Sequence, residues 1–429
     1  WWEIHIQAQA AGAAKVAASS RIDYWSAIDK SVLEPPSGPT AREPLDEIYK
    51  LIQSTMGSNT NPWWQGWSYW VMMVPQERSG YDDPAYGTQL QTMQTALADF
   101  ATMKAKIEGA ATDKLIEQLG DTPVATSLIA DLGTGLSAMT TRYASEGNDV
   151  AAYLIDRLFD AAVAGDTDRA LRALRAVDRI IDLLQVTGSA NDFAFGTQIR
   201  TQLAQWLAAI TATNASASTM AKLADAASQP RASGDFILAA HGYRQFLEWS
   251  IAQFFAVPAN IRFGELSLNA NVGTGQPINF GTFAETQAGY DRILRDLIAQ
   301  QKRRTPMNNG QAEAPLVFSA ATTGDSYFGK SLASTLTTWD SADTSSRAAL
   351  RSAALALAVE HFHRTHGDYP QSLIQVAGTV PALDLTPDAG GFGQWELIRF
   401  PARDGDAVPP YQLVYGGTAI IGIGVPRPE

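Results

Sequence analysis

The segment 149–184 constrains the fold of this chain more strongly than any other. It consists of two stretches with helical periodicity, 149–164 and 166–184, which only Gly165 separates. Glycine readily takes the left-handed conformation that ends a helix, and Asp166 can accept hydrogen bonds from the free amides of the next helix. Apolar residues of the second stretch recur every three or four positions, at Leu171, Leu174, Val177, Ile181 and Leu184. They share one helix face, so the sequence predicts an antiparallel helical hairpin.

Helical patterns also dominate much of the remaining sequence. Amphipathic segments follow one another from 89 to 247, and further helices are predicted at 285–301 and 346–366. Short runs near the C-terminus, rich in aromatic and aliphatic residues, predict three strands at Trp395–Phe400, Tyr411–Tyr415 and Thr418–Val425. The predicted fold is therefore mainly α, made of helical hairpins with a small α+β unit at the C-terminus.

Changes in composition divide the chain into four predicted parts. A Pro-rich break at 34–39 ends an N-terminal helix, 1–34, and precedes a helical domain that spans 40–260. The next part, 261–343, begins with a stretch rich in Asn, Gly and Thr and is predicted to be a loop-rich connecting region with one helix. The small α+β unit takes up 344–429.

Composition excludes several classes of protein. The chain has no cysteine, which excludes disulfide scaffolds, thiolate metal sites and cysteine nucleophiles. A hydrophobic fraction of 45% is too high for an intrinsically disordered chain. With 32 basic and 44 acidic side chains the net charge is −12, which argues against binding to nucleic acid. No G-x-S-x-G elbow or dinucleotide fingerprint is present, so we predict no catalytic residues and no cofactor.

The first residues, Trp1 and Trp2, precede a polar, Ala-rich helical stretch. Indole rings favour the headgroup level of a membrane, so we expect a membrane helix before Trp1 that tethers the protein. The alternative is a soluble N-terminal helix whose tryptophans pack on the core. Within the chain, no stretch reaches the roughly 18 consecutive apolar residues of a spanning helix. We expect an extracytoplasmic location, periplasmic or in the cell envelope, which the absence of cysteine fits.

The segment 63–70 has the densest aromatic composition of the chain, with five aromatic residues in eight positions. Each such side chain can bury about 150–250 Å², so the segment is either part of the core or a contact surface. As an interface, it would use its four tryptophans, which are Trp63, Trp64, Trp67 and Trp70. Packing in the core is the alternative.

The segment 324–331 matches the phosphate-binding pattern G-x-x-x-x-G-K-[ST], with Gly324, Gly329, Lys330 and Ser331 at the defining positions. In such a loop backbone amides face the phosphates, while the lysine and serine serve the terminal phosphates and Mg²⁺. Bulky Tyr327 and Phe328 stand where the loop must curl, and the sequence that follows lacks the alternating strands and helices of a nucleotide-binding core. A Gly-bounded turn before a short helix is the alternative.

Three of the five histidines lie in the segment 361–366. On a helix Glu360 and His363 share a face, as do His363 and His366, while His361 points elsewhere. Glu360, His363 and His366 are weak candidates for metal ligands, because a metal needs three or four converging ligands and no H-E-x-x-H motif is present. Otherwise His363 and His366 interact favourably with the dipole at the end of the helix.

The segment 350–373 runs from LRSAALALAVE to HGDYPQSL. It resembles the "ALAVE-x-(4–5)-HG-x-YP-x-SL" segment of large membrane-anchored, Ala/Leu-rich helical proteins of planctomycete-type bacteria, and a shorter form occurs in type II secretion pseudopilins. The segment 165–184 resembles their "GD-x-x-x-AL-x-x-L" segment, which is similar to tetratricopeptide (TPR) hairpins. The resemblance implies a helical, partly TPR-like extracytoplasmic protein with no assigned activity. The chain lacks the long apolar pilin helix and a regular 34-residue period, which puts filament assembly and a repeat array in doubt.

These observations favour a non-enzymatic, membrane-associated extracytoplasmic scaffold or subunit. It would act by contact with a protein partner or with a second copy of itself. The alternative is a nucleotide-binding or hydrolytic enzyme that uses the Gly324–Ser331 loop or the His361–His366 cluster.

Overall fold

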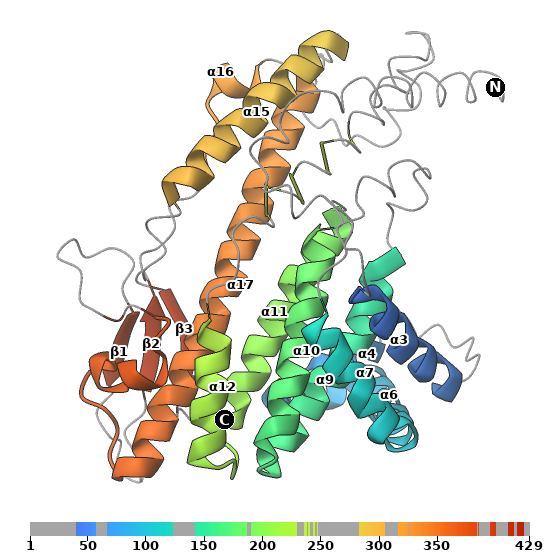
Figure 1. Ribbon diagram of the computed structural model, residues 1–429, viewed down its shortest axis with the longest axis vertical. Coiled ribbons are helices and arrows are strands. Elements are labelled where there is room, and N and C mark those ends of the chain that lie inside the picture. Colours follow the sequence, from blue (N-terminus) through green and yellow to red (C-terminus); the bar gives the residue numbers. More distant parts are fainter. Residues whose placement is uncertain are drawn as a thin grey trace.

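The computed structural model describes fifteen stretches of the chain, namely residues 40–56, 67–122, 142–186, 190–229, 236–237, 239–240, 243–244, 247, 283–304, 316–324, 326–383, 385, 395–399, 411–415 and 418–423. The predicted N-terminal helix over 1–34 and two of the tryptophans, Trp63 and Trp64, lie outside these residues. Helices make up most of the described part, so the predicted mainly α fold is confirmed (Figure 1). Among the described residues, no helix combines the length and the apolar character needed to cross a membrane.

The described helices form an N-terminal, a central and a C-terminal group. The N-terminal group consists of α3 (Arg42–Met56), α4 (Trp67–Met72), α5 (Pro75–Arg78), the 3-10 turns η3 (Ser79–Tyr81) and η4 (Pro84–Tyr86), α6 (Gly87–Ile107) and α7 (Ala110–Asp121). The central group consists of α9 (Arg142–Val163), α10 (Thr167–Val186), α11 (Ala190–Ile210) and α12 (Ala217–Ser228). The C-terminal group consists of α15 (Phe283–Arg304), α16 (Ala320–Thr323) and α17 (Tyr327–His366). The central helices stand side by side, with α3, α6 and α7 on one side and α17 on the other (Figure 1).

The predicted hairpin is present as α9 and α10. Gly165 has a φ of 79°, and its N–H donates to the carbonyl of Ala162 (3.2 Å). The N–H of Asp166 donates to the carbonyl of Ala161 (2.9 Å), which completes a glycine-terminated helix end. The Asp166 carboxylate then accepts from the N–H of Arg169 (3.1 Å) at the start of α10. The prediction for this segment is therefore confirmed, including the roles of Gly165 and Asp166.

Helix α17 is longer than the sequence predicts. It has 40 residues and starts at Tyr327, whereas the sequence predicts a start at 346. Its first half is rich in Ser and Thr, which are mediocre helix formers because their hydroxyls compete for backbone groups. In α17 these hydroxyls bond back to carbonyls one turn earlier, as Thr337 does to Ala333 (2.9 Å) and Thr338 to Ser334 (3.0 Å). The predicted domain division at 343/344 falls inside this helix.

Two hydrophobic cores lie along α17. The main core joins the N-terminal and central helices to the second half of α17, from Leu350 to Val359. The second core lies between α15, the beginning of α11 and the first half of α17. In it Trp339 of α17 stacks on Phe193 of α11, with ring centroids 5.0 Å apart. Helix α15, predicted over 285–301, contributes Tyr290, Ile293, Leu294 and Leu297.

A small antiparallel sheet follows α17 through the 3-10 helix η7 (Leu373–Thr379). Its strands β1 (Trp395–Arg399), β2 (Tyr411–Tyr415) and β3 (Thr418–Ile423) are arranged in the order β1-β2-β3. They start at the predicted residues, and β1 and β3 end one and two residues earlier than predicted. Leu413 pairs with Leu397 on one side and with Ile421 on the other, and it is buried in the main core. The sheet therefore packs against the helical body.

Candidate functional site

The tryptophan-rich segment divides between the core and the surface. Trp67 is 2% exposed, and its ring lies 5.6 Å from that of Phe100 on α6. Val71, one turn later, is buried as well, so this face of α4 belongs to the main core. Trp67 thus takes the core alternative and is not available as an interface residue. Trp70 lies on another face of α4 and is only partly buried.

Four aromatic side chains, Tyr69, Trp70, Tyr81 and Tyr86, form what we call the aromatic strip. The rings meet edge to face in sequence, with centroid distances of 5.8 Å for Tyr69–Trp70, 5.3 Å for Trp70–Tyr81 and 5.7 Å for Tyr81–Tyr86. This is a favourable geometry for aromatic pairs. Tyr69 and Tyr86 are 48% and 46% exposed, so both ends of the strip face solvent. The aromatic density of the sequence indicated Trp70 as a contact residue but did not indicate Tyr81 and Tyr86.

Two short turns place these tyrosines beside α4. Tyr81 ends η3 and Tyr86 ends η4, which begins with Pro84. The Asp83 carboxylate caps η4 by accepting from the N–H of Ala85 (2.8 Å). The Asp83-Pro84 pair between the two tyrosines is typical of a turn and was the signal available in the sequence.

Acidic side chains flank the aromatic strip. Asp82 and Asp83 are exposed between its two C-terminal tyrosines, and Glu77 lies in α5 just before η3. Burial raises the pKa of Tyr81, and the Tyr69 and Tyr86 phenols and the Glu77 carboxylate raise it further. Apart from Arg78, the charged side chains next to the strip in the sequence are therefore acidic.

Arg78, the one basic residue in the segment 67–103, points away from the strip. Its Nη2 donates to the carbonyl of Val71 (2.9 Å), and its guanidinium carbon lies 5.4 Å from the centre of the Trp206 ring. The neighbouring Glu77 accepts from Gln205 of α11 (3.2 Å). Arg78 and Glu77 thus fix α5 to α11 and leave the strip without a cation from its own segment.

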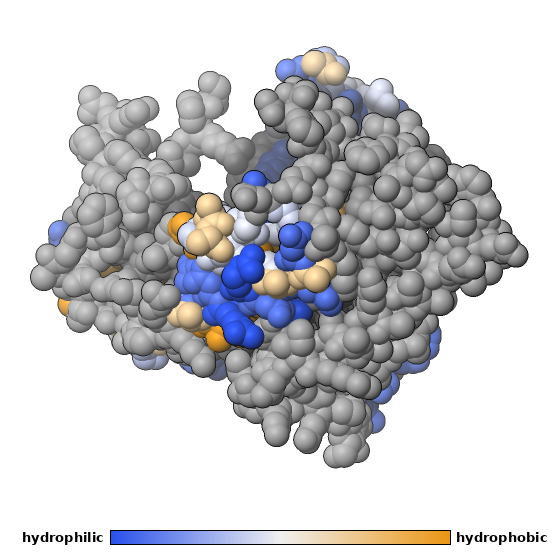
Figure 2. Space-filling model, turned by 90° about the horizontal axis from the view of Figure 1, so that it is seen from above, coloured by the Kyte–Doolittle hydropathy of each residue, from blue (hydrophilic) through white to orange (hydrophobic). Residues whose placement is uncertain are grey.

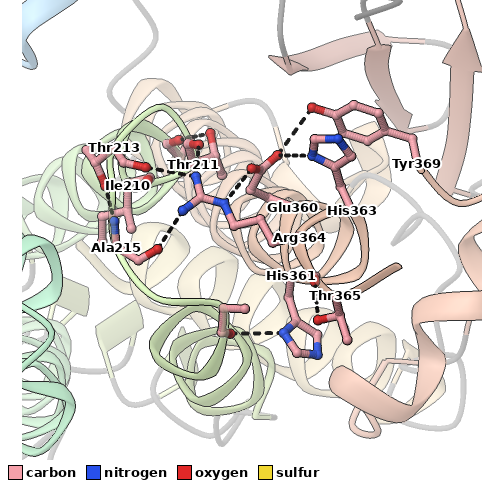
Figure 3. Close-up of polar contacts among 12 residues, drawn as sticks. Ile210, Thr211, Thr213, Ala215, Glu360, His361, His363, Arg364, Thr365 and Tyr369 are labelled. Carbon is pink, nitrogen blue, oxygen red and sulfur yellow. Dashed lines mark hydrogen bonds and ion pairs between the residues drawn. The ribbon is translucent and has the colours of Figure 1, made fainter. Parts of the chain in front are cut away.

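A second polar cluster lies at the end of α17, where Arg364 reaches the connection between α11 and α12 (Figure 3). Its Nη1 donates to the carbonyl of Ala215 (2.5 Å), and its Nη2 donates to the carbonyls of Thr211 (3.1 Å) and Thr213 (2.8 Å). Its Nε donates to Glu360 (2.7 Å), which also accepts from the Tyr369 hydroxyl (3.3 Å). Carbonyls at the end of a helix lack intrahelical partners and carry partial negative charge. Arg364 satisfies them and ties α17 to α11.

The three clustered histidines make contacts within α17 and with the elements around its end. His361 donates from Nδ1 to the carbonyl of Ala217 (2.9 Å), while His366 donates to that of Phe362 (3.0 Å). His363 shares a face with Glu360, as predicted, and its Nδ1 lies 3.7 Å from Oε2 of Glu360. The His363 ring stacks on that of Tyr369, with centroids 4.0 Å apart. Glu360 is committed to Arg364 and Tyr369, so the predicted trio Glu360, His363 and His366 does not converge. Within the described residues no group of three or more His, Asp or Glu is placed to hold a metal ion.

The residues of the HG-x-YP-x-SL segment end α17 and begin η7. Gly367 ends the helix with a φ of 83°, and its N–H donates to the carbonyl of His363 (2.8 Å). Tyr369 is held between His363 and Glu360, and Ser372 begins η7 with a capping box formed with Gln375. The pattern is therefore a structural device at this position.

The residues of the phosphate-loop match have structural roles in the described part of the chain. Gly324 ends α16 with a φ of 67°, and Ser326 caps α17 by accepting from the N–H of Gly329 (3.1 Å). A Cβ at Gly329 would collide with the carbonyl of Thr323, which explains the glycine without a phosphate. Lys330 is exposed in the first turn of a long helix, not the short one predicted, and Ser331 beside it is partly buried. From this end of the molecule, hydrophilic residues predominate among those coloured, and hydrophobic ones form small patches (Figure 2).

Buried charged residues join α10, α11 and α17. Arg200 of α11 is 2% exposed, and its Nη1 lies 2.5 Å from Asp343 of α17. Gln185 of α10 accepts from Arg200 (2.8 Å) and donates to Asp343 (3.1 Å), and Arg347 contacts the other Asp343 oxygen (2.9 Å). Burial alone would raise the pKa of Asp343, but attraction to Arg200 and Arg347 and hydrogen bonds outweigh it, so the pKa is lowered. The charged side chains of Arg200 and Asp343 therefore hold the three helices together.

Asp149 of α9 is a buried acid beside α4. It is 5% exposed, and burial raises its pKa to about 7 despite hydrogen bonds from the side chains of Ser68 and Trp67. Next to it Asn148 donates to the Ser68 hydroxyl (2.5 Å). These contacts fix α4, and hence the aromatic strip, to α9.

Comparison with protein-family models, with curated proteins and with solved structures finds no match to this chain. The resemblance of the segment 350–373 therefore stays a prediction.

Proposed function

We propose that this protein is a non-enzymatic scaffold or subunit that acts by contact with another protein, and that the aromatic strip is its contact surface. The observation that carries the proposal is the exposure of Tyr69 and Tyr86, at 48% and 46%, at the two ends of a continuous row of rings. Tyrosine and tryptophan dominate the energetics of protein interfaces because they bury large areas at a low cost in conformational entropy.

The remaining polar clusters support a binding role over catalysis. Arg364, paired with Glu360, satisfies carbonyls at the end of α11, and Arg200, Asp343 and Gln185 join three helices. A catalytic acid or base must instead be free to exchange protons with a substrate. The aromatic strip is not tied to another part of the fold in this way, because the side chains of Tyr69 and Tyr86 face solvent and can contact a partner.

We further propose that the protein is associated with a membrane on its extracytoplasmic side. This part of the proposal rests on the resemblance of the segment 350–373 to membrane-anchored extracytoplasmic proteins, and the absence of cysteine is compatible with it. A protein placed there as part of an assembly would present the strip to a neighbouring subunit.

Site-specific photo-crosslinking in cells that produce the full-length protein tests the proposal. Benzoylphenylalanine replaces Tyr69 or Tyr86 in two variants, and the control variant carries it at Tyr327, which is 43% exposed on α17. We expect a discrete adduct of one partner at positions 69 and 86, recovered with the membrane fraction, and no such adduct at 327. The same pattern of adducts at all three positions, or none at 69 and 86, would refute the strip as a contact surface.

A further inference from the structure

We infer that the aromatic strip binds an arginine-rich segment of the partner protein; this inference rests on the function proposed above. The arrangement of the rings leaves aromatic surface open to a ligand at both ends of the strip. In an edge-to-face pair the edge of one ring meets one face of the other, so the strip covers at most one face of each end ring, and these end residues, Tyr69 and Tyr86, are about half exposed. The face of an aromatic ring attracts a cation placed within about 6 Å of its centre.

The charges next to the strip are complementary to those of a basic segment. Between Lys50 and Lys104 the sequence has a single basic residue, Arg78, and that side chain is turned inward onto Val71 and Trp206. Exposed Asp82 and Asp83 lie within the strip's own segment, and the whole chain carries a net charge of −12. A surface of π-faces and carboxylates without a local cation is complementary to a positively charged segment.

Within the described part of the chain, no side chain makes a cation–π contact with the strip. In that part both cation–π contacts lie elsewhere, with Arg78 over Trp206 and Arg157 over Tyr153. The described residues therefore offer the strip no cation of their own.

The chemistry of the site favours arginine over lysine and over other classes of ligand. A guanidinium group stacks flat on an aromatic face and at the same time donates to carboxylates or phenol oxygens at its rim. An ammonium group is more strongly hydrated and cannot stack in this way. The acidic residues that flank the strip repel anionic lipid headgroups and nucleic-acid phosphates.

Binding of labelled peptides to the purified full-length chain tests the inference. The probes are three fluorescein-labelled octapeptides that alternate glycine with arginine, lysine or glutamine, and fluorescence anisotropy measures their affinity. We expect the arginine peptide to bind more tightly than the lysine peptide and the glutamine peptide not to bind. In the double variant Tyr69→Ala/Tyr86→Ala the affinity for the arginine peptide should fall about tenfold, because two cation–π contacts are lost.

Matched variants separate the strip from non-specific attraction to an acidic protein. Tyr327→Ala removes a tyrosine of similar exposure on α17, and Asp368→Asn removes an exposed carboxylate after the same helix; neither should change the affinity. Tyr69→Phe/Tyr86→Phe keeps the rings and should retain binding of the arginine peptide. Asp82→Asn should weaken binding, more so at low salt than at high salt. Melting temperatures of all variants verify that each is folded.

Three outcomes would overturn the inference. Equal binding of the arginine peptide to the wild type and to the double alanine variant would show that the strip is not its site. Glutamine and arginine peptides that bind equally well would show that the partner segment is not basic. In both cases adducts at positions 69 and 86 would still stand, so the proposed function would survive. Strip-dependent binding to phosphatidylcholine vesicles would instead assign the strip to a membrane and refute both proposals.

Discussion

Replacement of Arg200 by Met should destabilise the main core by about 3–5 kcal/mol, the loss typical of a broken buried ion pair. In the wild type Arg200 and Arg347 both contact Asp343, and Gln185 bridges Arg200 and Asp343. Without Arg200 the carboxylate remains buried with one cation, while Gln185 loses the donor to its oxygen. The destabilisation arises mainly because the buried Asp343 carboxylate is then compensated only by Arg347, rather than from the lost contact itself.

The double variant Arg200→Met/Asp343→Leu separates these two contributions. It removes both opposite charges, and a buried pair replaced by apolar groups of similar size is often close to neutral. Gln185 loses partners on both sides, which costs about 1–3 kcal/mol, while Arg347 can turn to solvent because its side chain is 18% exposed. The double variant should therefore be more stable than Arg200→Met, although it carries one more substitution.

Urea unfolding followed by tryptophan fluorescence measures both effects. With an m-value of about 3 kcal/mol/M, the single substitution lowers the midpoint by about 1–1.7 M. Lys50→Met is the matched control, because it breaks an ion pair with Glu47 whose side chains are 68% and 56% exposed, and it should cost less than about 1 kcal/mol. A midpoint for Arg200→Met equal to that of the control, or a double variant less stable than the single one, would refute this reasoning.

Three further predictions concern other parts of the structure, each measured by thermal unfolding. Arg364→Lys should lower stability by about 1–3 kcal/mol, because an ammonium group cannot serve three carbonyls and a carboxylate from one planar fork; an unchanged melting temperature would contradict this. Gly329→Ala should cost about 1–3 kcal/mol, since its methyl group meets the backbone carbonyl of Thr323, whereas Gly378→Ala, with open space around it, should cost little; equal losses would count against the packing argument. Folded Asp149 has a pKa of about 7 and keeps its proton where the unfolded chain has lost it, so it makes stability fall as pH rises from about 4 to 7. Asp149→Asn should flatten that part of the melting-temperature profile, and an unchanged slope would assign the pH dependence to other groups.

The parts of the fold that the sequence predicts well depend on local interactions. The α9–α10 hairpin follows from the apolar stripe of α10 and from Gly165, all within one short segment. Helix α15 and the three strands were likewise predicted from the patterns of their own residues. The first half of α17 was missed because its Ser and Thr residues indicate a loop, whereas burial of Leu332, Leu336 and Trp339 decides the structure.

The candidate sites were less predictable because they bring distant residues together. Arg364 contacts carbonyls about 150 positions earlier in the chain, and nothing in its own segment indicates them. The aromatic density around Trp67 left core packing and a contact surface open as alternatives, and the helical period places Trp67 with Val71 inside and leaves Tyr69 and Trp70 outside. This division could have been found from the sequence once α4 was recognised as a helix.

Helix α17 has a mechanical consequence for the molecule. Its 40 residues correspond to a rod of about 60 Å, which is held in the second core at its start and in the main core towards its end. Because one continuous helix packs in both cores, a displacement of α15 or α16 at one end is transmitted along α17 to the Arg364 junction at the other. A load applied at either end is therefore shared by both halves of the protein.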